Sequence, residues 1–304
     1  MGSAVGGFMA GAGHRVTLVG RAAHVEAIAA RGLRVTGIWG DHCFTGMDAR
    51  SSAEGLSSGD FDVVFITVKS YDTAAALEAA APVVDENTLV CVYQNGLGNI
   101  EQAAARFSWA RTVGTRAIYG VRVTEPGAIV VTVIASPTAL GAPRPEGPVE
   151  RVRELAAALD AAGLPTVYSD RVETLLWAKV AYNCALNPLS ALLDAPYGAL
   201  PEIPEARRMM DTVIDELYAV GLARGVLLDP PDADAYRELF YHRLVPPTAA
   251  HYASMHEDFT RKRRTEIDAL NGAIVRLGAE CGVPCPLNAW LTDLVHAREA
   301  AMRK

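Results

Sequence analysis

The chain has 304 residues, of which 28 are Lys or Arg and 35 are Asp or Glu, and half of its residues are hydrophobic. This length and composition suit one large or two medium globular domains, and they exclude disordered, collagen-like and disulfide-rich classes. The net charge of −7 argues against general nucleic-acid binding, which needs a basic surface. No apolar run reaches the roughly 20 residues of a membrane-spanning helix.

The five cysteines are scattered through apolar stretches: Cys43, Cys91, Cys184, Cys281 and Cys285. This pattern is typical of reduced, buried thiols, so we expect a cytoplasmic protein. The net charge and the lack of a long apolar run predict no nucleic-acid and no membrane partner. Cys281 and Cys285 lie close together in the sequence with no histidine nearby, so we expect no metal site.

In the first half of the chain, short β-branched runs alternate with Ala-rich helical stretches. Strands are predicted over residues 15–19, 63–68, 88–92 and 128–133, and helices over 73–81 and 150–162. The continuous apolar run at 63–68 is typical of a strand buried on both faces. The alternation predicts an α/β domain with a parallel sheet and helices on both faces, over residues 1–168.

After residue 168 the β-branched runs stop. Helices are predicted over residues 172–187, 205–224, roughly 248–280, and from near 288 onward. The pairs Pro230-Pro231 and Pro246-Pro247 mark loops between them. We therefore expect an all-helical second domain over residues 169–304.

A cluster of glycines opens the chain, with a helix stop at Gly13-His14. Dinucleotide-binding folds begin with a strand, then G-x-G-x-x-G, then a helix. If Gly2 is the last glycine of this motif, the helix covers about residues 3–12, a normal length. We therefore expect that the first strand and two glycines lie upstream, and that this chain begins at an internal Met.

Polar residues follow three predicted strands, at the carboxyl ends where open parallel sheets bind ligands. Arg21 stands about 20 residues after Gly2, where NAD enzymes carry an acidic residue and NADP enzymes a basic one for the 2′-phosphate. Lys69 and Asn95-Gly96 follow the next two strands. The alternatives are an ordinary surface arginine, a solvated strand end and a plain turn.

Lys179, Asn183 and Asn187 recur every four residues within an otherwise apolar stretch. On a helix they form one stripe about 12 Å long. A buried lysine is costly unless it is paired, and desolvation lowers a lysine's pKa toward the range useful for proton transfer. Because asparagine is both donor and acceptor, the stripe suits an active-site cleft or, alternatively, a structural hydrogen-bond network.

Glu266 is the expected partner of Lys179, because it borders an apolar stripe at helical spacing. Ser254 and Asp258 lie upstream, four residues apart. On one straight helix Ser254 and Glu266 would point about 120° apart, so a shared site requires a bend. The charge run from Arg261 to Arg264 is interpreted as a solvated face.

Together, Lys179-x3-Asn183-x3-Asn187-Pro188, Ser254-Met255 and Thr265-Glu266-Ile267-Asp268-x2-Asn271-Gly272 resemble the ketopantoate reductase (2-dehydropantoate 2-reductase) family. The resemblance covers essentially the whole chain. It implies a Rossmann-type NADP-binding domain over residues 1–168 and a helical substrate-binding and catalytic domain over 169–304. It also implies reduction of ketopantoate to pantoate by NADPH, in pantothenate biosynthesis.

The resemblance further implies roles for individual residues. Lys179 would be the general acid that protonates the forming alkoxide, and Glu266 would hold Lys179 or the product hydroxyl. The substrate-binding residues would be Asn183, Asn187, Ser254 and Asn95. The cofactor-binding residues would be Gly2, Arg21, Lys69 and Asn95, with Asn95 between the nicotinamide ribose and the substrate.

Two other functions stay open at this stage. One is a related NADPH-dependent reductase of another 2-oxo acid or carbonyl substrate. The other is a non-catalytic NADP-binding protein, because only one glycine of the fingerprint is present. The helical half is apolar enough to offer a homodimer surface, but the sequence leaves the oligomeric state open.

Overall fold

The computed structural model describes residues 1–302, and the chain divides into an α/β unit and a helical unit. The α/β unit comprises Met1–Gln94 and Asn99–Val172, and the helical unit comprises Asn95–Gly98 and the chain from Glu173 onward. The sequence places the division after residue 168 and assigns Asn95 to the first domain. The difference arises because Asn95–Gly98 bonds to the helical unit, where the Leu97 N–H donates to the Ala269 carbonyl at 2.8 Å.

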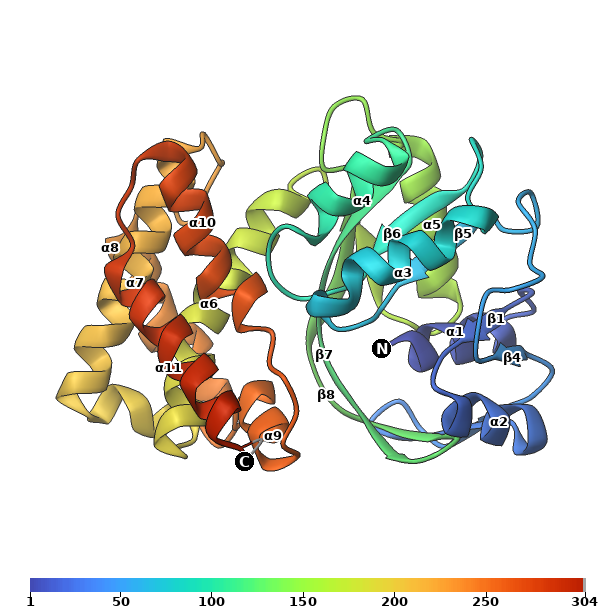
Figure 1. The fold of residues 1–304 in the computed structure, drawn as a ribbon, viewed down its shortest axis with the longest axis horizontal. Coiled ribbons are helices and arrows are strands. Elements are labelled where there is room, and N and C mark those ends of the chain that lie inside the picture. The colour runs from blue at the N-terminus through green and yellow to red at the C-terminus, as the bar shows by residue number, and fades with distance from the viewer. Residues whose placement is uncertain (303–304) are drawn as a thin grey trace. The chain divides into compact units, whose positions relative to one another are not determined.

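A seven-stranded sheet forms the centre of the α/β unit, in the order β3-β2-β8-β7-β6-β5 with β9 also paired to β8 (Figure 1). Its strands are β2 (Leu33–Gly37), β3 (His42–Phe44), β5 (Val63–Ile66), β6 (Leu89–Val92), β7 (Thr112–Glu125), β8 (Ala128–Gly141) and β9 (Thr166–Tyr168). The pairs β2–β3 and β7–β8 are antiparallel and the other pairs are parallel. β1 (Thr17–Val19) and β4 (Asp48–Arg50) form a separate parallel pair.

Five helices belong to the α/β unit: α1 (Gly2–Gly11), α2 (Ala22–Arg31), α3 (Thr73–Ala80), α4 (Asn99–Phe107) and α5 (Val149–Ala161). Alternate residues of β6 face opposite sides of the sheet. Leu89 and Cys91 pack in one core with α1 and α5, whereas Val90 and Val92 pack in another with α3 and α4. The predicted α/β architecture, with helices covering both faces of a mostly parallel sheet, is confirmed.

The long hairpin of β7 and β8 departs from the expectation, which has a strand only over residues 128–133. Its register shifts at several points between Arg116 and Glu125, and Pro137 lies inside β8. These irregularities interrupt the alternation of apolar and polar residues that identifies a strand in sequence.

The helical unit contains α6 (Val172–Leu193), α7 (Pro204–Ala223), α8 (Ala233–Leu239), α9 (Ser254–Thr260), α10 (Asn271–Cys281) and α11 (Pro286–Met302). Residues 173–302 contain no strand, as the sequence predicts. α6 supplies a run of fully buried side chains to the core of this unit, among them Ala181, Cys184 and Leu186. Throughout residues 1–302, every helix lacks the length or the apolar character needed to cross a membrane.

The predicted single helix over residues 248–280 is wrong. α9 ends at Thr260, Lys262 adopts a left-handed φ of 51°, and a short 3-10 turn at Ile267–Ala269 precedes α10. The break is held from both sides, because the Arg263 N–H donates to the Asp258 carbonyl and the Thr265 N–H donates to the buried Glu299 carboxylate at 2.7 Å. This break supplies the bend that a site shared by Ser254 and Glu266 requires.

Candidate active site

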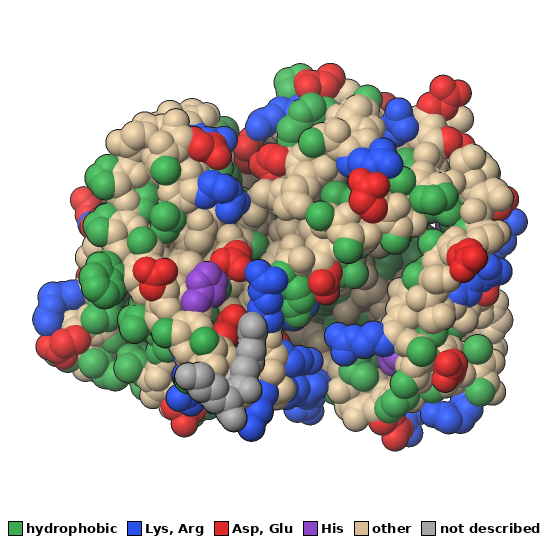
Figure 2. Space-filling model, in the orientation of Figure 1, with side chains coloured by type: hydrophobic (Ala, Val, Ile, Leu, Met, Phe, Trp, Pro, Cys, Tyr) green, Lys and Arg blue, Asp and Glu red, His purple; other side chains and the backbone are tan. Residues whose placement is uncertain are grey.

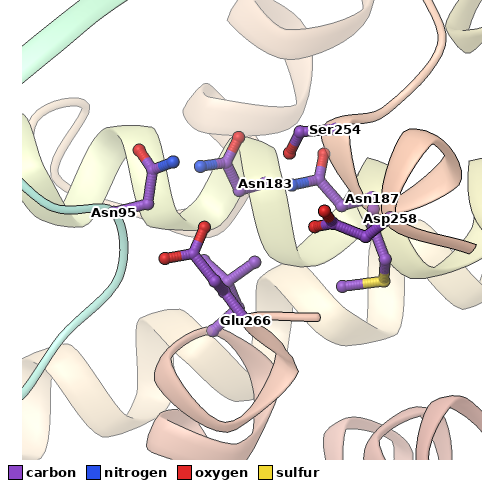
Figure 3. A pocket seen from close by; sticks show the side chains of 8 residues that line it. Asn95, Asn183, Asn187, Ser254, Asp258 and Glu266 are labelled. Carbon is purple, nitrogen blue, oxygen red and sulfur yellow. The ribbon is translucent and has the colours of Figure 1, made fainter. Parts of the chain in front are cut away.

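A polar pocket lies within the helical unit, at the middle of α6 (Figure 3). Its volume is about 250 Å³ when the space open to solvent is counted, and its lining residues are Asn95, Asn183, Asn187, Ser254, Met255, Asp258, Glu266 and Leu270. In Figure 3, Asn95, Asn183 and Asn187 lie in a row along one side, with Glu266 across from the first two and Asp258 beside Asn187. The predicted residues Asn95, Asn183, Asn187, Ser254 and Glu266 are therefore gathered in one cavity.

Asn95 reaches this pocket because of the glycine that follows it. Gly96 has a φ of +85°, and a Cβ there would lie 2.3 Å from the Ala269 carbonyl oxygen. Only glycine allows both the positive φ and the close backbone approach. The turn fixes Asn95 beside α6, where its Oδ1 accepts a hydrogen bond from the Lys179 Nζ at 2.6 Å.

Lys179 is half-buried one helical turn before Asn183. An ammonium group has three donors and no acceptor, so the bond to Asn95 leaves donors for further partners. The same bond turns the Asn95 amide, so that its NH₂ lies away from Lys179. In Figure 3 this nitrogen points toward Asn183.

Glu266 and Asp258 bring two buried carboxylates to the pocket, with 9% and 3% of their surfaces exposed. Glu266 immediately precedes the 3-10 turn at Ile267–Ala269. Asp258 pairs with Arg263 at 3.0 Å, so one member of the predicted solvated charge run binds the carboxylate of a pocket residue. The sequence analysis does not assign Asp258 to the site, although its spacing of four residues from Ser254 indicates that the two share a helix face.

Asn271, at the start of α10, compensates for the backbone N–H that Pro188 lacks in α6. Pro188 has no N–H, so the Cys184 carbonyl four residues earlier loses its helical partner. The Asn271 amide donates to that carbonyl at 3.1 Å and to Asn288 Oδ1 at 2.9 Å. This interaction ties α6 to the start of α10, close to Leu270 in the pocket lining.

The other predicted cofactor residues lie in the α/β unit. Gly2 is the first residue of α1, and a Cβ there would stand 2.5 Å from the Thr67 Oγ1 that follows β5. Arg21 is exposed and occupies the N-cap position of α2, whose first turn has no acidic residue. Lys69 is half-buried and immediately precedes the 3-10 turn that leads into α3.

The described residues also bear on metal binding and on thiol chemistry. Among residues 1–302, His, Cys, Asp and Glu side chains form no group of three that could hold a metal ion. Burial raises the pKa of the Cys184 thiol on α6, so this cysteine stays protonated and is a poor nucleophile. Figure 2 shows acidic and basic side chains interspersed over the visible face of the helical unit.

Comparison with known proteins gives consistent matches along the chain. The family model described as "Ketopantoate reductase PanE/ApbA" matches residues 1–145, and the model of its C-terminal part matches residues 171–299. A 2-dehydropantoate 2-reductase from Aquifex aeolicus is 40% identical, with 98% of this chain and 94% of the relative covered.

Solved structures agree with these sequence matches. A PanE/ApbA family ketopantoate reductase from Ralstonia eutropha has a TM-score of 0.86 at 33% identity, covering 99% of this chain and 95% of that one. A D-mandelate dehydrogenase solved with NADH and anilino(oxo)acetate has a TM-score of 0.85 at 25% identity, covering 99% and 96%. The residue motifs, the two-unit fold and these matches along nearly the whole chain agree, and the chain belongs to the ketopantoate reductase family.

Proposed function

We propose that this protein reduces the 2-oxo group of 2-dehydropantoate to the hydroxyl of pantoate, with NADPH as the reductant, in pantothenate biosynthesis. The observation that carries the proposal is the small polar pocket beside Lys179. Six of its eight lining residues carry amide, hydroxyl or carboxyl groups. A compact, oxygen-rich acid suits such a site, and the relatives named 2-dehydropantoate 2-reductase support this choice.

Amide and hydroxyl groups would bind the substrate. Asn183, Asn187 and Ser254 line the same cavity and supply hydrogen-bond donors for carboxylate and hydroxyl oxygens. Asn95 would contact the substrate from the other end of the row, because its bond to Lys179 directs its NH₂ away from that side chain. The apolar groups of Met255 and Leu270 would face the substrate's methyl groups.

Lys179 would supply the proton. NADPH, when bound, supplies a hydride to C2 of the substrate. The oxygen on C2 then gains negative charge, which the Lys179 ammonium stabilises and neutralises by proton transfer. Glu266, a buried carboxylate in the same pocket, would hold the Lys179 ammonium or accept a hydrogen bond from the new hydroxyl.

Three residues of the α/β unit would contribute to binding NADPH: Gly2, Arg21 and Lys69. A side chain at Gly2 would clash with Thr67 unless the threonine moved, and the last glycine of a dinucleotide fingerprint serves the same close packing of helix and strand. Arg21 combines its guanidinium with the N-terminus of α2, and both favour a phosphate over a bare ribose hydroxyl. Lys69 would bind the same adenosine phosphate end.

The test is NADPH oxidation measured with 2-dehydropantoate and a panel of other 2-oxo acids. We expect the highest kcat/KM with 2-dehydropantoate and NADPH. The similarity to D-mandelate dehydrogenase favours one second candidate, reduction of an aryl 2-oxo acid, which a preference for phenylglyoxylate would establish. Absence of turnover with every 2-oxo acid would contradict both activities and support a non-catalytic NADP-binding protein.

We propose further that the protein acts in the cytoplasm as a homodimer. Its five cysteines are all free thiols, which is typical of a reducing compartment. Trp290 and Leu294 are exposed one turn apart on α11, and such apolar side chains favour self-association. Cell fractionation and light scattering after gel filtration test the two statements separately.

A further inference from the structure

The orientation of the Asn187 amide decides whether its NH₂ group or its carbonyl oxygen faces the pocket. An asparagine side chain presents an NH₂ donor on one side and a carbonyl acceptor on the other, and a half-turn exchanges them. Asn187 is only 4% exposed and lines the pocket from α6. Whichever group satisfies its other side therefore decides whether the substrate meets a donor or an acceptor.

The group on that other side is the hydroxyl of Tyr197, which donates to Asn187 Oδ1 at 2.7 Å. Within residues 1–302 this is the one hydrogen bond that the Tyr197 hydroxyl makes. A buried phenol whose proton had no acceptor would be costly, so the O–H must donate here. Burial also raises the pKa of Tyr197 well above its usual value, which keeps the donor protonated.

Tyr197 is itself held firmly. It is 4% exposed and opens the 3-10 turn Tyr197–Glu202. Its backbone N–H donates to the His251 carbonyl at 2.9 Å, and its ring packs edge-on against the rings of Tyr182 and His251. A side chain confined in this way can impose an orientation on its partner.

We infer that Tyr197 is a positioning residue, which locks the Asn187 amide with its NH₂ toward the substrate. In Figure 3 the Asn187 nitrogen points toward Asn183, whereas its oxygen does not. The pocket thereby presents a donor to an oxygen of the bound acid. The inference rests on the proposed function only in taking a 2-oxo acid as the ligand.

The variant Tyr197→Phe removes the hydroxyl and keeps the ring. The amide of Asn187 is then free to turn its oxygen toward the substrate's oxygens, so we expect KM for the 2-oxo acid to rise about tenfold. We expect kcat to change less than about threefold and KM for NADPH to stay unchanged. Tyr218→Phe is the matched control, because it also removes a buried hydroxyl bond, to the Pro230 carbonyl at 3.1 Å.

A double variant separates positioning from general stability. In an Asn187→Ala background there is no amide to orient, so adding Tyr197→Phe should change KM by less than about twofold. An unchanged KM in the single variant would overturn the inference. So would a tenfold rise that persists in the Asn187→Ala background.

A neutron crystal structure of the unaltered protein, exchanged into heavy water, tests the geometry without any variant or turnover. We expect two deuterium atoms on the pocket side of Asn187 and one between Tyr197 and Asn187 Oδ1. Amide deuterium atoms facing Tyr197 would refute the inference, even in a protein that reduces 2-dehydropantoate. If no 2-oxo acid is reduced, the proposed function fails while this measurement still decides the role of Tyr197.

Discussion

The two units of this protein place their polar groups by different means. In the α/β unit, Arg21 and Lys69 follow β1 and β5, so the direction of the strands sets where their backbone lies, and Arg21 is exposed. In the helical unit, Asn187 and Asp258 are buried, and each is held by a polar partner, Tyr197 and Arg263 respectively. Because buried polar groups lose more when a partner is removed, changes in the helical unit should have the larger effects.

The largest effect is expected from Lys179→Ala. Removing the general acid should lower kcat by about 10²–10⁴-fold, because no other group donates the proton at the same point. The binding of NADPH, measured by fluorescence titration, should be unchanged. Lys262→Asn serves as a control for loss of a lysine, since Lys262 is exposed and asparagine tolerates its left-handed φ. A Lys179→Ala enzyme with normal kcat would refute the assigned mechanism.

The next effect concerns stability. The buried Glu216 carboxylate on α7 accepts hydrogen bonds from the Leu287 and Asn288 N–H groups and from the Asn288 side chain, at the start of α11. Glu216→Ala leaves these donors unpaired and should lower the free energy of unfolding by about 3 kcal/mol in a urea titration. Glu280→Ala breaks an exposed pair with Arg224 and should cost under about 1 kcal/mol. Equal losses in both variants would contradict the argument that a buried polar group loses more than an exposed one when its partner is removed.

A smaller effect is expected in the α/β unit. Arg21→Ala removes the group proposed to bind the 2′-phosphate, so KM for NADPH should rise about tenfold while KM for NADH stays nearly constant. Arg15→Ala is the matched control, because Arg15 precedes β1 in the sequence whereas Arg21 follows it. Equal changes in KM for NADPH and for NADH would show that Arg21 does not bind the 2′-phosphate.

The smallest effect is a pH dependence. Burial lowers the pKa of His24, whose Nδ1 accepts from the Gly127 N–H and whose Nε2 lies 2.9 Å from Ser3 Oγ. Because the folded pKa lies below the unfolded value of 6.5, the unfolded chain binds more protons at acidic pH. Stability should therefore fall as the pH drops below about 6.5. In His24→Gln, the melting temperature measured from pH 5 to pH 8 should depend less steeply on pH than in the unaltered protein. An unchanged dependence would show that another group causes it.

The sequence predicts the α/β unit and the buried helix α6 well, because both carry strong local patterns. The repeat Lys179, Asn183, Asn187 needs no tertiary information. The strand expected over 63–68 is found as β5, but it ends at Ile66 and lies at the edge of the sheet, so the expectation that it is buried on both faces is wrong: only Ile66 is buried and Val68 is exposed. The hairpin of β7 and β8 is different, since its bulges and Pro137 break the pattern, and only pairing along its length makes these segments strands.

The composition of the pocket could be predicted only in part. The motifs identify Ser254 and Glu266, but not the break at Lys262 that brings them together, because a left-handed lysine has no local signature. The bond from Lys179 to Asn95 joins residues far apart in sequence, and so does the Asn271 bond to Cys184. Such pairings depend on the packed fold, which local periodicity does not encode.

The central claim is that the pocket of the helical unit binds the substrate, and a crystal structure of the protein with NADP⁺ and pantoate tests it most directly. The account predicts pantoate in the cavity lined by Asn183, Asn187 and Glu266, with its C2 oxygen within hydrogen-bond distance of the Lys179 Nζ. Pantoate bound elsewhere, or with its C2 oxygen out of reach of Lys179, would contradict it.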